Sequence, residues 1–258
     1  MRASSLCLFL LLFVFSPFSA AGADGARLER IARAGEIRIG LTGDYRPFSA
    51  LDEKAGEFSG LDVDLGRSLA GALGVRPVFV ATSWPTLSAD LEADKFDIAM
   101  GGISVTEARS KIGLFSEPVL SDGKTPITAC ANVARFQTLE QIDRKGVRLV
   151  VNPGGTNEKF ARAHIHAATI VMHPDNVTIF QEIVAGRADL MITDAIETRL
   201  QAKLHPQLCA VHPDAPFDRA EKAYFMPRDA ALKARVDGWL EGLRASGELK
   251  RRIGAWVE

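Results

Sequence analysis

Residues 150–160 read VVNPGGTNEKF, a stretch in which a strand ends, a tight turn follows and a helix begins. The β-branched run stops at Asn152, two glycines form the turn, and Thr156 is a good N-cap for the helix. The backbone N–H groups of such a turn and the helix macrodipole favour a bound carboxylate or phosphate. An ordinary strand-to-helix turn with satisfied caps is the alternative interpretation.

Strand and helix patterns alternate on both sides of this turn. Strands are expected at residues 36–41, 76–81, 96–100, 148–152, 169–172 and 190–193, with helical patterns between them. This order predicts an α/β protein with parallel or mostly parallel sheets, whose ligands bind outside the carboxyl ends of the strands. Because the pattern restarts after residue 125, we expect two lobes with a small molecule bound between them. Residues 230–257 have apolar side chains at helical spacing, which is typical of core helices.

The N-terminus has the features of an export signal, which we place at residues 1–23. Arg2 precedes an apolar run from Leu6 to Phe18, and small residues precede Asp24. The run is too short to span a bilayer, so the mature protein is expected to be periplasmic, with no stable membrane association. Cys7 lies at the start of the run and not beside the cleavage site, which argues against a lipid anchor.

The mature chain retains two cysteines, Cys130 and Cys209. An even pair in a chain sent to an oxidising compartment favours a disulfide, and two separately buried thiols are the alternative. The five histidines are scattered without the spacing of a zinc helix, so no metal is expected. The net charge of −1 argues against nucleic acid as a partner and favours a small molecule.

Several motifs resemble the amino-acid class of the type II periplasmic solute-binding proteins over about residues 27–258. They are GDYRPF, FDIAMGGIS, TEARS, FSEPVL and TDA. The resemblance implies a two-lobed fold with two α/β sheets joined by two crossover strands. It places lobe 1 at residues 24–125 and 219–258 and lobe 2 at residues 126–218, with crossovers near residues 125–130 and 217–224.

Seven longer segments resemble, more narrowly, the cyclohexadienyl dehydratases. They are DGKTPIT, ARFQTLEQID, VNPGGTNEKFARA, HPDNVTIFQ, DLMITDAIE, HPQLCAVHP and EKAYFMPRD. This resemblance implies a lyase of phenylalanine biosynthesis that uses no cofactor. It removes water and carbon dioxide from prephenate to give phenylpyruvate, or from arogenate to give phenylalanine.

The chemistry requires two anion-binding groups and one acid. Arg109 matches the arginine that grips a ligand carboxylate in the family, and Ser104 would donate a hydroxyl bond from the same loop. A surface arginine paired with Glu107 or Glu117 is the alternative. The opening turn would supply the second anion site, through the backbone of Gly155 and Thr156 and the side chains of Asn152, Thr156 and Asn157.

Glu197 matches the general acid of the family, and it needs a raised pKa to hold its proton at neutral pH. A solvent-facing glutamate is the alternative. Asp194 matches the aspartate that holds an α-ammonium group in amino-acid-binding relatives, and it could meet arogenate in the same way.

The remaining candidates belong to the pocket wall and to the crossovers. Tyr45 and Trp84 would offer flat apolar contact to a cyclohexadiene ring, and Asp44 would bond its hydroxyl, although core packing is an equal interpretation of Trp84. Lys222 and Lys124 lie near the two crossovers and are possible further cations, or simply solvated lysines. A transport-linked amino-acid-binding protein is the alternative function, for which a protonated glutamate in the cleft has no use.

Overall fold

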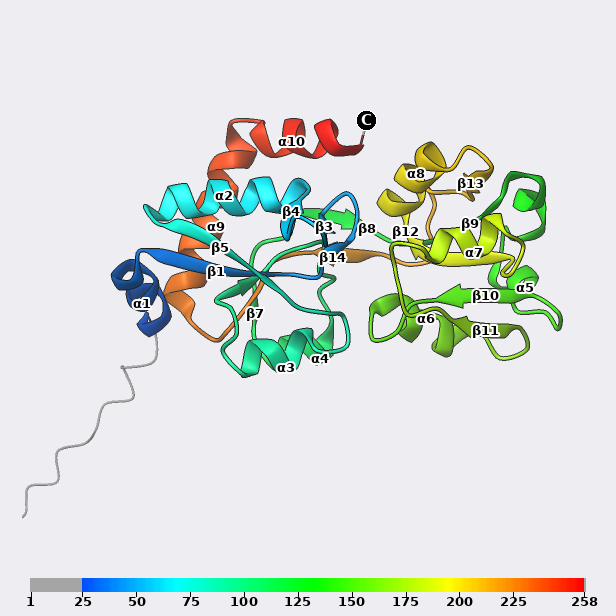
Figure 1. The fold of residues 1–258 in the computed structure, drawn as a ribbon, viewed down its shortest axis with the longest axis horizontal. Coiled ribbons are helices and arrows are strands. Elements are labelled where there is room, and N and C mark those ends of the chain that lie inside the picture. The colour runs from blue at the N-terminus through cyan, green and yellow to red at the C-terminus, as the bar shows by residue number, and fades with distance from the viewer. Residues whose placement is uncertain (1–24, 258) are drawn as a thin grey trace, which may run out of the picture.

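The computed structural model of the protein describes residues 25–257. The expected export signal, residues 1–23, lies outside the described residues. Two lobes, each built around a five-stranded sheet, lie side by side along the longest axis of the molecule (Figure 1). Within residues 25–257, no helix combines the length and the apolar character that a membrane span requires.

The first lobe contains a sheet of order β5-β1-β6-β15-β7. Its strand β1 is parallel to both β5 and β6, whereas β15 is antiparallel to its neighbours. The lobe also carries a small antiparallel sheet of β2, β3 and β4. Its elements are α1 (Ala26–Ala34), β1 (Glu36–Leu41), β2 (Asp44–Tyr45), β3 (Ser49–Asp52), β4 (Glu57–Ser59), α2 (Leu61–Leu73), β5 (Arg76–Ala81), α3 (Leu87–Glu92), β6 (Ile98–Ala99), α4 (Glu107–Ser110), β7 (Leu114–Phe115), β15 (Phe225–Met226), α9 (Ala230–Ala245) and α10 (Glu248–Val257).

The second lobe contains a sheet of order β11-β10-β12-β9-β13. Its strand β10 is parallel to β11 and β12, and β9 is antiparallel to β12 and β13. Its elements are β9 (Lys124–Ala129), the 3-10 helix η2 (Cys130–Arg135), α5 (Leu139–Ile142), β10 (Arg148–Val151), α6 (Thr156–His164), β11 (Thr169–Met172), α7 (Ile179–Val184), β12 (Leu190–Asp194), α8 (Ala195–Leu204) and β13 (Leu208–Ala210).

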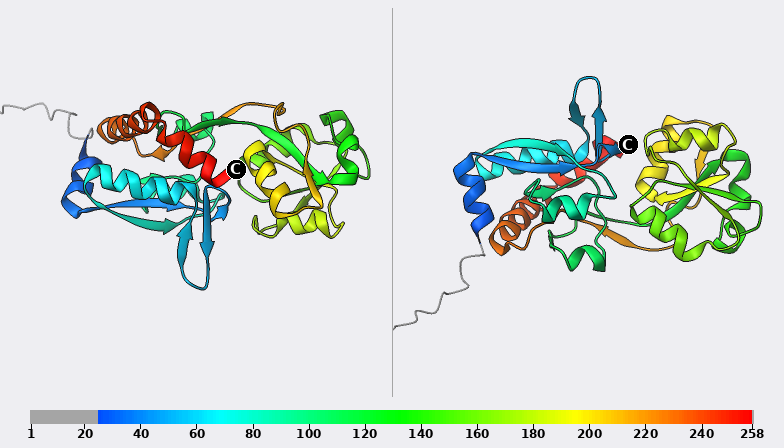
Figure 2. Two further views of the ribbon diagram at one scale, coloured as in Figure 1. Left: turned by 90° about the horizontal axis from the view of Figure 1, so that it is seen from above. Right: turned by 60° about the horizontal axis from the view of Figure 1, so that its bottom comes forward.

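Two short strands connect the lobes. β8 (Leu120–Asp122) and β14 (Ala220–Lys222) form an antiparallel pair between the two sheets (Figures 1 and 2). The second crossover lies where we expected it, but the first lies upstream of the expected residues 125–130. Those residues belong mainly to β9, whose buried side chains require strand neighbours on both sides and find them in β12 and β13.

The apolar residues that recur at helical spacing in the sequence lie in the core of the first lobe. Helices α2 and α9 pack their buried faces against the sheet in one continuous cluster. Residues 230–257 form two helices, because Gly247 has a φ of +70° and separates α9 from α10. The apolar spacing correctly marked the buried residues of α9, which are Leu232, Val236, Leu240 and Leu243, but Trp256 in α10 is exposed and is not a core residue.

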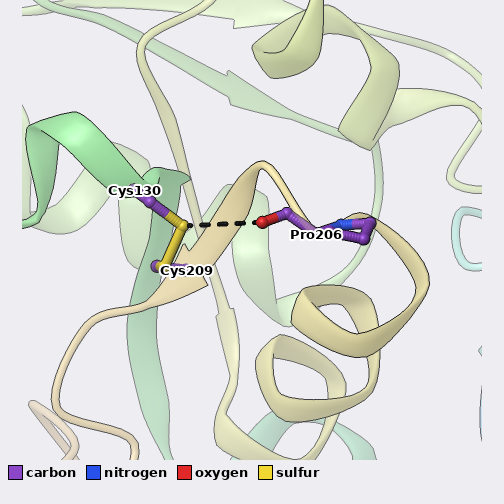
Figure 3. The surroundings of a disulfide bond; sticks show 3 residues. All are labelled: Cys130, Pro206 and Cys209. Carbon is purple, nitrogen blue, oxygen red and sulfur yellow. Dashed lines mark hydrogen bonds between the residues drawn. A yellow bond between two sulfur atoms is a disulfide. The ribbon is translucent and has the colours of Figure 1, made fainter.

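A disulfide joins Cys130 and Cys209, as the even pair of cysteines predicted (Figure 3). Cys130 follows β9 and Cys209 lies in β13, so the bond fastens two neighbouring strands of the second lobe. The two cysteines are 79 residues apart in the sequence. In the chain-entropy model, a disulfide that closes a loop of this size stabilises the folded state by about 4 kcal/mol, because it restricts the unfolded chain. Both cysteines lie in the same lobe, so the bond leaves the connection between the lobes unconstrained.

Candidate active site

A narrow polar pocket lies between the lobes, where the carboxyl ends of several strands meet. Both lobes and the connecting strand β14 contribute to its wall. The cavity volume is about 20 Å³, which is room for about one water molecule, so a ring-sized substrate requires the lobes to separate. The wall residues are Tyr45, Trp84, Gly102, Ser104, Asn152, Gly155, Thr156, Asn157, Asn176, Asp194 and Lys222.

The turn between β10 and α6 supplies one side of this wall, but its capping differs from our expectation. Gly155 is the N-cap of α6 and makes no side-chain cap bond, whereas Thr156 is the first helical residue. Thr156 is therefore free to turn its hydroxyl to Lys124, whose Nζ donates to Oγ1 over 3.0 Å. The Gly154 N–H donates to Glu158 Oε2 over 2.7 Å, so this N–H is not available to a ligand.

The same turn touches the first lobe. Gly154 has a φ of +82°, and a Cβ added there would lie 2.6 Å from the Pro85 nitrogen. A glycine is therefore required both by the backbone conformation and by the close approach of the two lobes.

A buried cluster of three charges, Lys124, Asp194 and Lys222, forms the charged floor of the site, and Asp194 and Lys222 belong to the pocket wall. Asp194, at the end of β12, accepts a hydrogen bond from Lys124 Nζ at 2.8 Å and another from Lys222 Nζ at 2.5 Å. Tyr45 donates its hydroxyl to the same carboxylate. Burial alone would raise the pKa of Asp194, but the two lysines outweigh it and hold this pKa well below its usual range. Asp194 is thus ionised, and both its oxygens are engaged.

Glu197 lies one helical turn into α8, and its side chain is buried. Burial raises its pKa to about 8, and the neighbouring negative charge of Asp194 acts in the same direction against the bond from Thr193. The alternative of a solvent-facing glutamate is therefore wrong, and Glu197 holds a proton at neutral pH. Its carboxyl group is not part of the pocket wall, but hydrogen bonds connect it through Thr193 to the wall residue Asn157.

Hydrogen bonds connect Glu197 to the charged floor. The Thr193 hydroxyl donates to Glu197 Oε2 over 2.5 Å, and the Asn157 amide donates to that hydroxyl over 3.0 Å. The Asn157 carbonyl oxygen in turn accepts from Lys124 at 2.5 Å. This chain fixes the orientation of the acid relative to the lysine and to the opening turn of α6.

Arg109 is also buried, which excludes the alternative of a surface arginine paired with Glu107 or Glu117. Its Nη1 donates to the Ser104 carbonyl over 2.9 Å, and its guanidinium lies 6.0 Å from the Trp84 ring centroid. Burial lowers the pKa of Arg109 to about 10, so it remains a cation at neutral pH. No carboxylate of the described residues forms an ion pair with it. The side chain therefore keeps donors for an anionic ligand.

Two aromatic residues, Tyr45 and Trp84, form part of the pocket wall on the side of the first lobe. Trp84 donates its Nε1–H to Asp44 Oδ1 over 3.0 Å, and its ring meets Tyr45 edge to face at 5.7 Å. Trp84 belongs to the pocket and also packs against two core clusters, so both interpretations of this residue are correct. Burial raises the pKa of Asp44, whose carboxyl is turned to the tryptophan and is not part of the wall.

Sequence reasoning missed two wall residues, Gly102 and Asn176. The Asn176 amide donates to the Asp44 carbonyl over 3.0 Å, while its own Oδ1 is buried without a partner. Asn176 follows β11, so its position after a strand end was the signal that could have found it. Lys124, which we named only as a possible cation, is buried and central to the site. In the part of the chain that the structure describes, no cluster of His, Cys, Asp or Glu side chains could hold a metal ion.

This fold and this cleft define a class of protein. The chain belongs to the bacterial extracellular solute-binding proteins, family 3, whose pattern it matches over residues 37–258. It is 58% identical over 236 residues to the cyclohexadienyl dehydratase of Pseudomonas aeruginosa, which covers 92% of this chain and 88% of that protein.

Two solved structures are similar to this chain over 90% of its length. One is an ancestral cyclohexadienyl dehydratase, which is 48% identical, has a TM-score of 0.56 and covers 90% of this chain and 96% of its own. The other is an ancestral amino acid-binding protein described as a precursor of cyclohexadienyl dehydratase. It is 32% identical with a TM-score of 0.84, over 90% of this chain and all of its own. The predicted two-lobed α/β fold is confirmed.

Proposed function

We propose that this protein is a cyclohexadienyl dehydratase that converts prephenate to phenylpyruvate, and arogenate to phenylalanine, by general acid catalysis between its lobes. The observation that carries the proposal is the buried Glu197, whose pKa is raised to about 8 and which hydrogen bonds connect to the cluster of Lys124, Asp194 and Lys222. The identity of 58% to a dehydratase supports it. A protein that only binds amino acids for transport has no use for such an acid, so this alternative is the weaker one.

The site residues would divide into two anion holders and one acid. Arg109 and Ser104 would bind one substrate carboxylate from the first lobe. The turn at Gly155 and Thr156, with the side chains of Asn152 and Asn157, would bind the other from the second lobe. Glu197 would protonate the departing ring hydroxyl as carbon dioxide leaves the ring. The new aromatic ring supplies the driving force, so the protein needs only orientation and a preorganised field.

We keep as part of the proposal the division into lobe 1 at residues 24–125 and 219–258 and lobe 2 at residues 126–218. The connecting strands β8 and β14 support a boundary in this region, although β9 of the second sheet already begins at Lys124. We also assign the protein to the periplasm after removal of residues 1–23. The family of extracellular solute-binding proteins and the disulfide support this location.

Turnover of prephenate by the purified mature protein tests the function directly. Phenylpyruvate should form and be detected by the absorbance of its enolate in alkali, in proportion to the amount of protein. Absence of phenylpyruvate, together with tight binding of a free amino acid in calorimetry, would establish the transport alternative.

The pH dependence of the reaction is expected to follow Glu197. Because the acid must carry its proton, activity is present below the pKa of about 8 and is lost as pH rises through it. The value of kcat/KM for prephenate should fall about tenfold per pH unit above that point. A flat profile between pH 7 and 10 would contradict the assignment. The residual activity of Glu197→Gln should lack this descending limb, which separates the titration of the acid from that of the lysines.

A further inference from the structure

Two buried acceptors in the pocket wall have no partner among residues 25–257. They are Oδ1 of Asn152 and Oδ1 of Asn176, and both residues are 4% exposed. Buried polar atoms are almost always hydrogen-bonded. An open acceptor in the wall of a binding pocket therefore indicates that the ligand supplies a donor there.

Other side-chain acceptors of the wall already receive a hydrogen bond. Lys124 and Lys222 donate to four of them, which are Ser104, Thr156, Asn157 and Asp194. A donor of the ligand would have to compete with a buried lysine at any of these four residues. It meets no such competition at the two asparagines.

A backbone carbonyl determines which end of the Asn176 amide is free. Its Nδ2 donates to the Asp44 carbonyl oxygen over 3.0 Å. Because that carbonyl can only accept, turning the amide over would bring two oxygens into contact. Asn176 therefore offers an acceptor to the pocket, whereas Asn152 keeps its amide N–H groups for the substrate carboxylate that the proposed function assigns to it.

The loop that carries Asn176 is itself held in place. It connects β11 to α7, and the Asp175 carboxylate accepts from the Val177 N–H over 2.8 Å and from the Thr178 hydroxyl over 2.7 Å. The His173 ring lies 2.9 Å from the same hydroxyl. This braced turn presents the Asn176 side chain to the first lobe in a defined orientation.

The ring hydroxyl is the donor that prephenate brings to the pocket, because both its carboxylates are ionised at neutral pH. We infer that Oδ1 of Asn176 accepts the hydrogen of this hydroxyl and so orients the leaving group. The inference rests on the proposed function and adds a residue that touches the group that departs. Arogenate carries the same hydroxyl, so the assignment applies to both substrates.

The bond to Asn176 would assist the proton transfer from Glu197. A hydroxyl whose hydrogen is held by an acceptor keeps its lone pairs for another donor, so the oxygen can take the proton of the acid as the C–O bond breaks and water leaves. The two residues belong to one part of the site. Burial and the charge of Asp194 raise the pKa of Glu197, and the charge of Asp44, whose carbonyl holds Asn176, adds to this rise.

A thermodynamic cycle on the residue and the ligand tests the inference. Calorimetry would give the dissociation constants of prephenate and of its analogue without the ring hydroxyl, in Glu197→Gln and in Glu197→Gln combined with Asn176→Leu. Leucine has the same branching as asparagine but no acceptor. We expect the added substitution to weaken binding of prephenate about tenfold more than binding of the analogue.

The comparison of ligands isolates the hydroxyl. Loss of the contact between Asn176 and Asp44 weakens both ligands equally and cancels from the cycle. An equal effect of Asn176→Leu on the two ligands would overturn the inference.

Steady-state kinetics on the single variant gives a second test. Asn176→Leu should lower kcat by about tenfold or more with prephenate and with arogenate, because the leaving group is no longer oriented. Asn132→Leu is the matched control, since this asparagine accepts from Arg135 at the surface of the second lobe, and unchanged kcat is expected there. A fall confined to arogenate would place its ammonium group at Asn176 and would overturn the assignment of the hydroxyl.

The outcomes separate the inference from the proposed function. Coupling between Asn176 and the hydroxyl in a protein that forms no phenylpyruvate would retain the hydroxyl site and overturn the dehydratase. Turnover without coupling would overturn the hydroxyl site alone. If Asn176→Leu fails to fold, Asn176→Ala takes its place in the cycle with the same expected coupling. Failure to bind prephenate at all would overturn both.

Discussion

Replacement of Glu197 by glutamine is expected to lower kcat for prephenate by about 10²–10⁴-fold, the usual contribution of a general acid. Glutamine has the shape of the protonated acid and can keep the bond from the Thr193 hydroxyl, but it has no proton to give to the leaving hydroxyl. The dissociation constant for prephenate should therefore remain within a few-fold of that of the unmodified protein, because the groups that bind the carboxylates are untouched.

Two further measurements make this result specific. The variant should be at least as stable as the unmodified protein in urea at neutral pH. Glu197 must take up a proton when the chain folds, because its pKa is raised to about 8 in the folded protein, whereas glutamine needs none. Glu182→Gln is a matched control, since this glutamate pairs with an exposed arginine on the surface of the second lobe, and full activity is expected there. Unchanged turnover in Glu197→Gln would remove this residue from the mechanism and direct attention to the lysines as the proton source.

Arg109→Lys is the second substitution with a large expected effect. The lysine keeps the charge but loses the planar fork that binds a carboxylate through two parallel bonds, and it loses the Nη1 that donates to the Ser104 carbonyl. We expect kcat/KM for prephenate to fall by about 10²-fold, mainly through a higher KM, because the lost bonds are made to substrate and transition state alike.

An exposed arginine provides the control for the test of Arg109. Arg187→Lys, at an exposed arginine paired with Glu182, should leave both kinetic constants unchanged. A fall in kcat at constant KM for Arg109→Lys would instead indicate that the guanidinium acts only in the transition state. No change in either constant would exclude Arg109 from the anion site.

Local sequence patterns predicted the elements that carry the site. The alternation at residues 36–41 and 76–81 marked two strands whose observed bounds are the same, and the turn after residue 151 does open onto the pocket. Such features depend on neighbours along the chain, so they can be recognised without the fold. The resemblance to known enzymes added the choice of Glu197, which periodicity alone could not distinguish from any other helical glutamate.

The features that sequence reasoning missed depend on contacts between distant segments. β9 looked like a crossover because its pairing with β12 and β13 cannot be seen from residues 124–129 alone. Lys124 looked like a solvated lysine because its partners lie 32, 33 and 70 residues away in the sequence. Asn176 has no local signal beyond its position after the end of β11, and its contact with the Asp44 carbonyl spans 132 residues.

The charged floor lies next to the two strands that connect the lobes, and this position has a mechanical consequence if the lobes rotate about that connection. Lys222 ends β14 and Lys124 follows β8, and these two strands are the ones that pass between the lobes. If one lobe rotates against the other, atoms near the rotation axis move least and atoms at the outer edge of the cleft move most. The contacts of Gly154 with Pro85 and of Asn176 with Asp44 can therefore part while the lysines stay in place. Lys124 and Lys222 would therefore already be in position when a dianionic substrate enters, before the two lobes close on it.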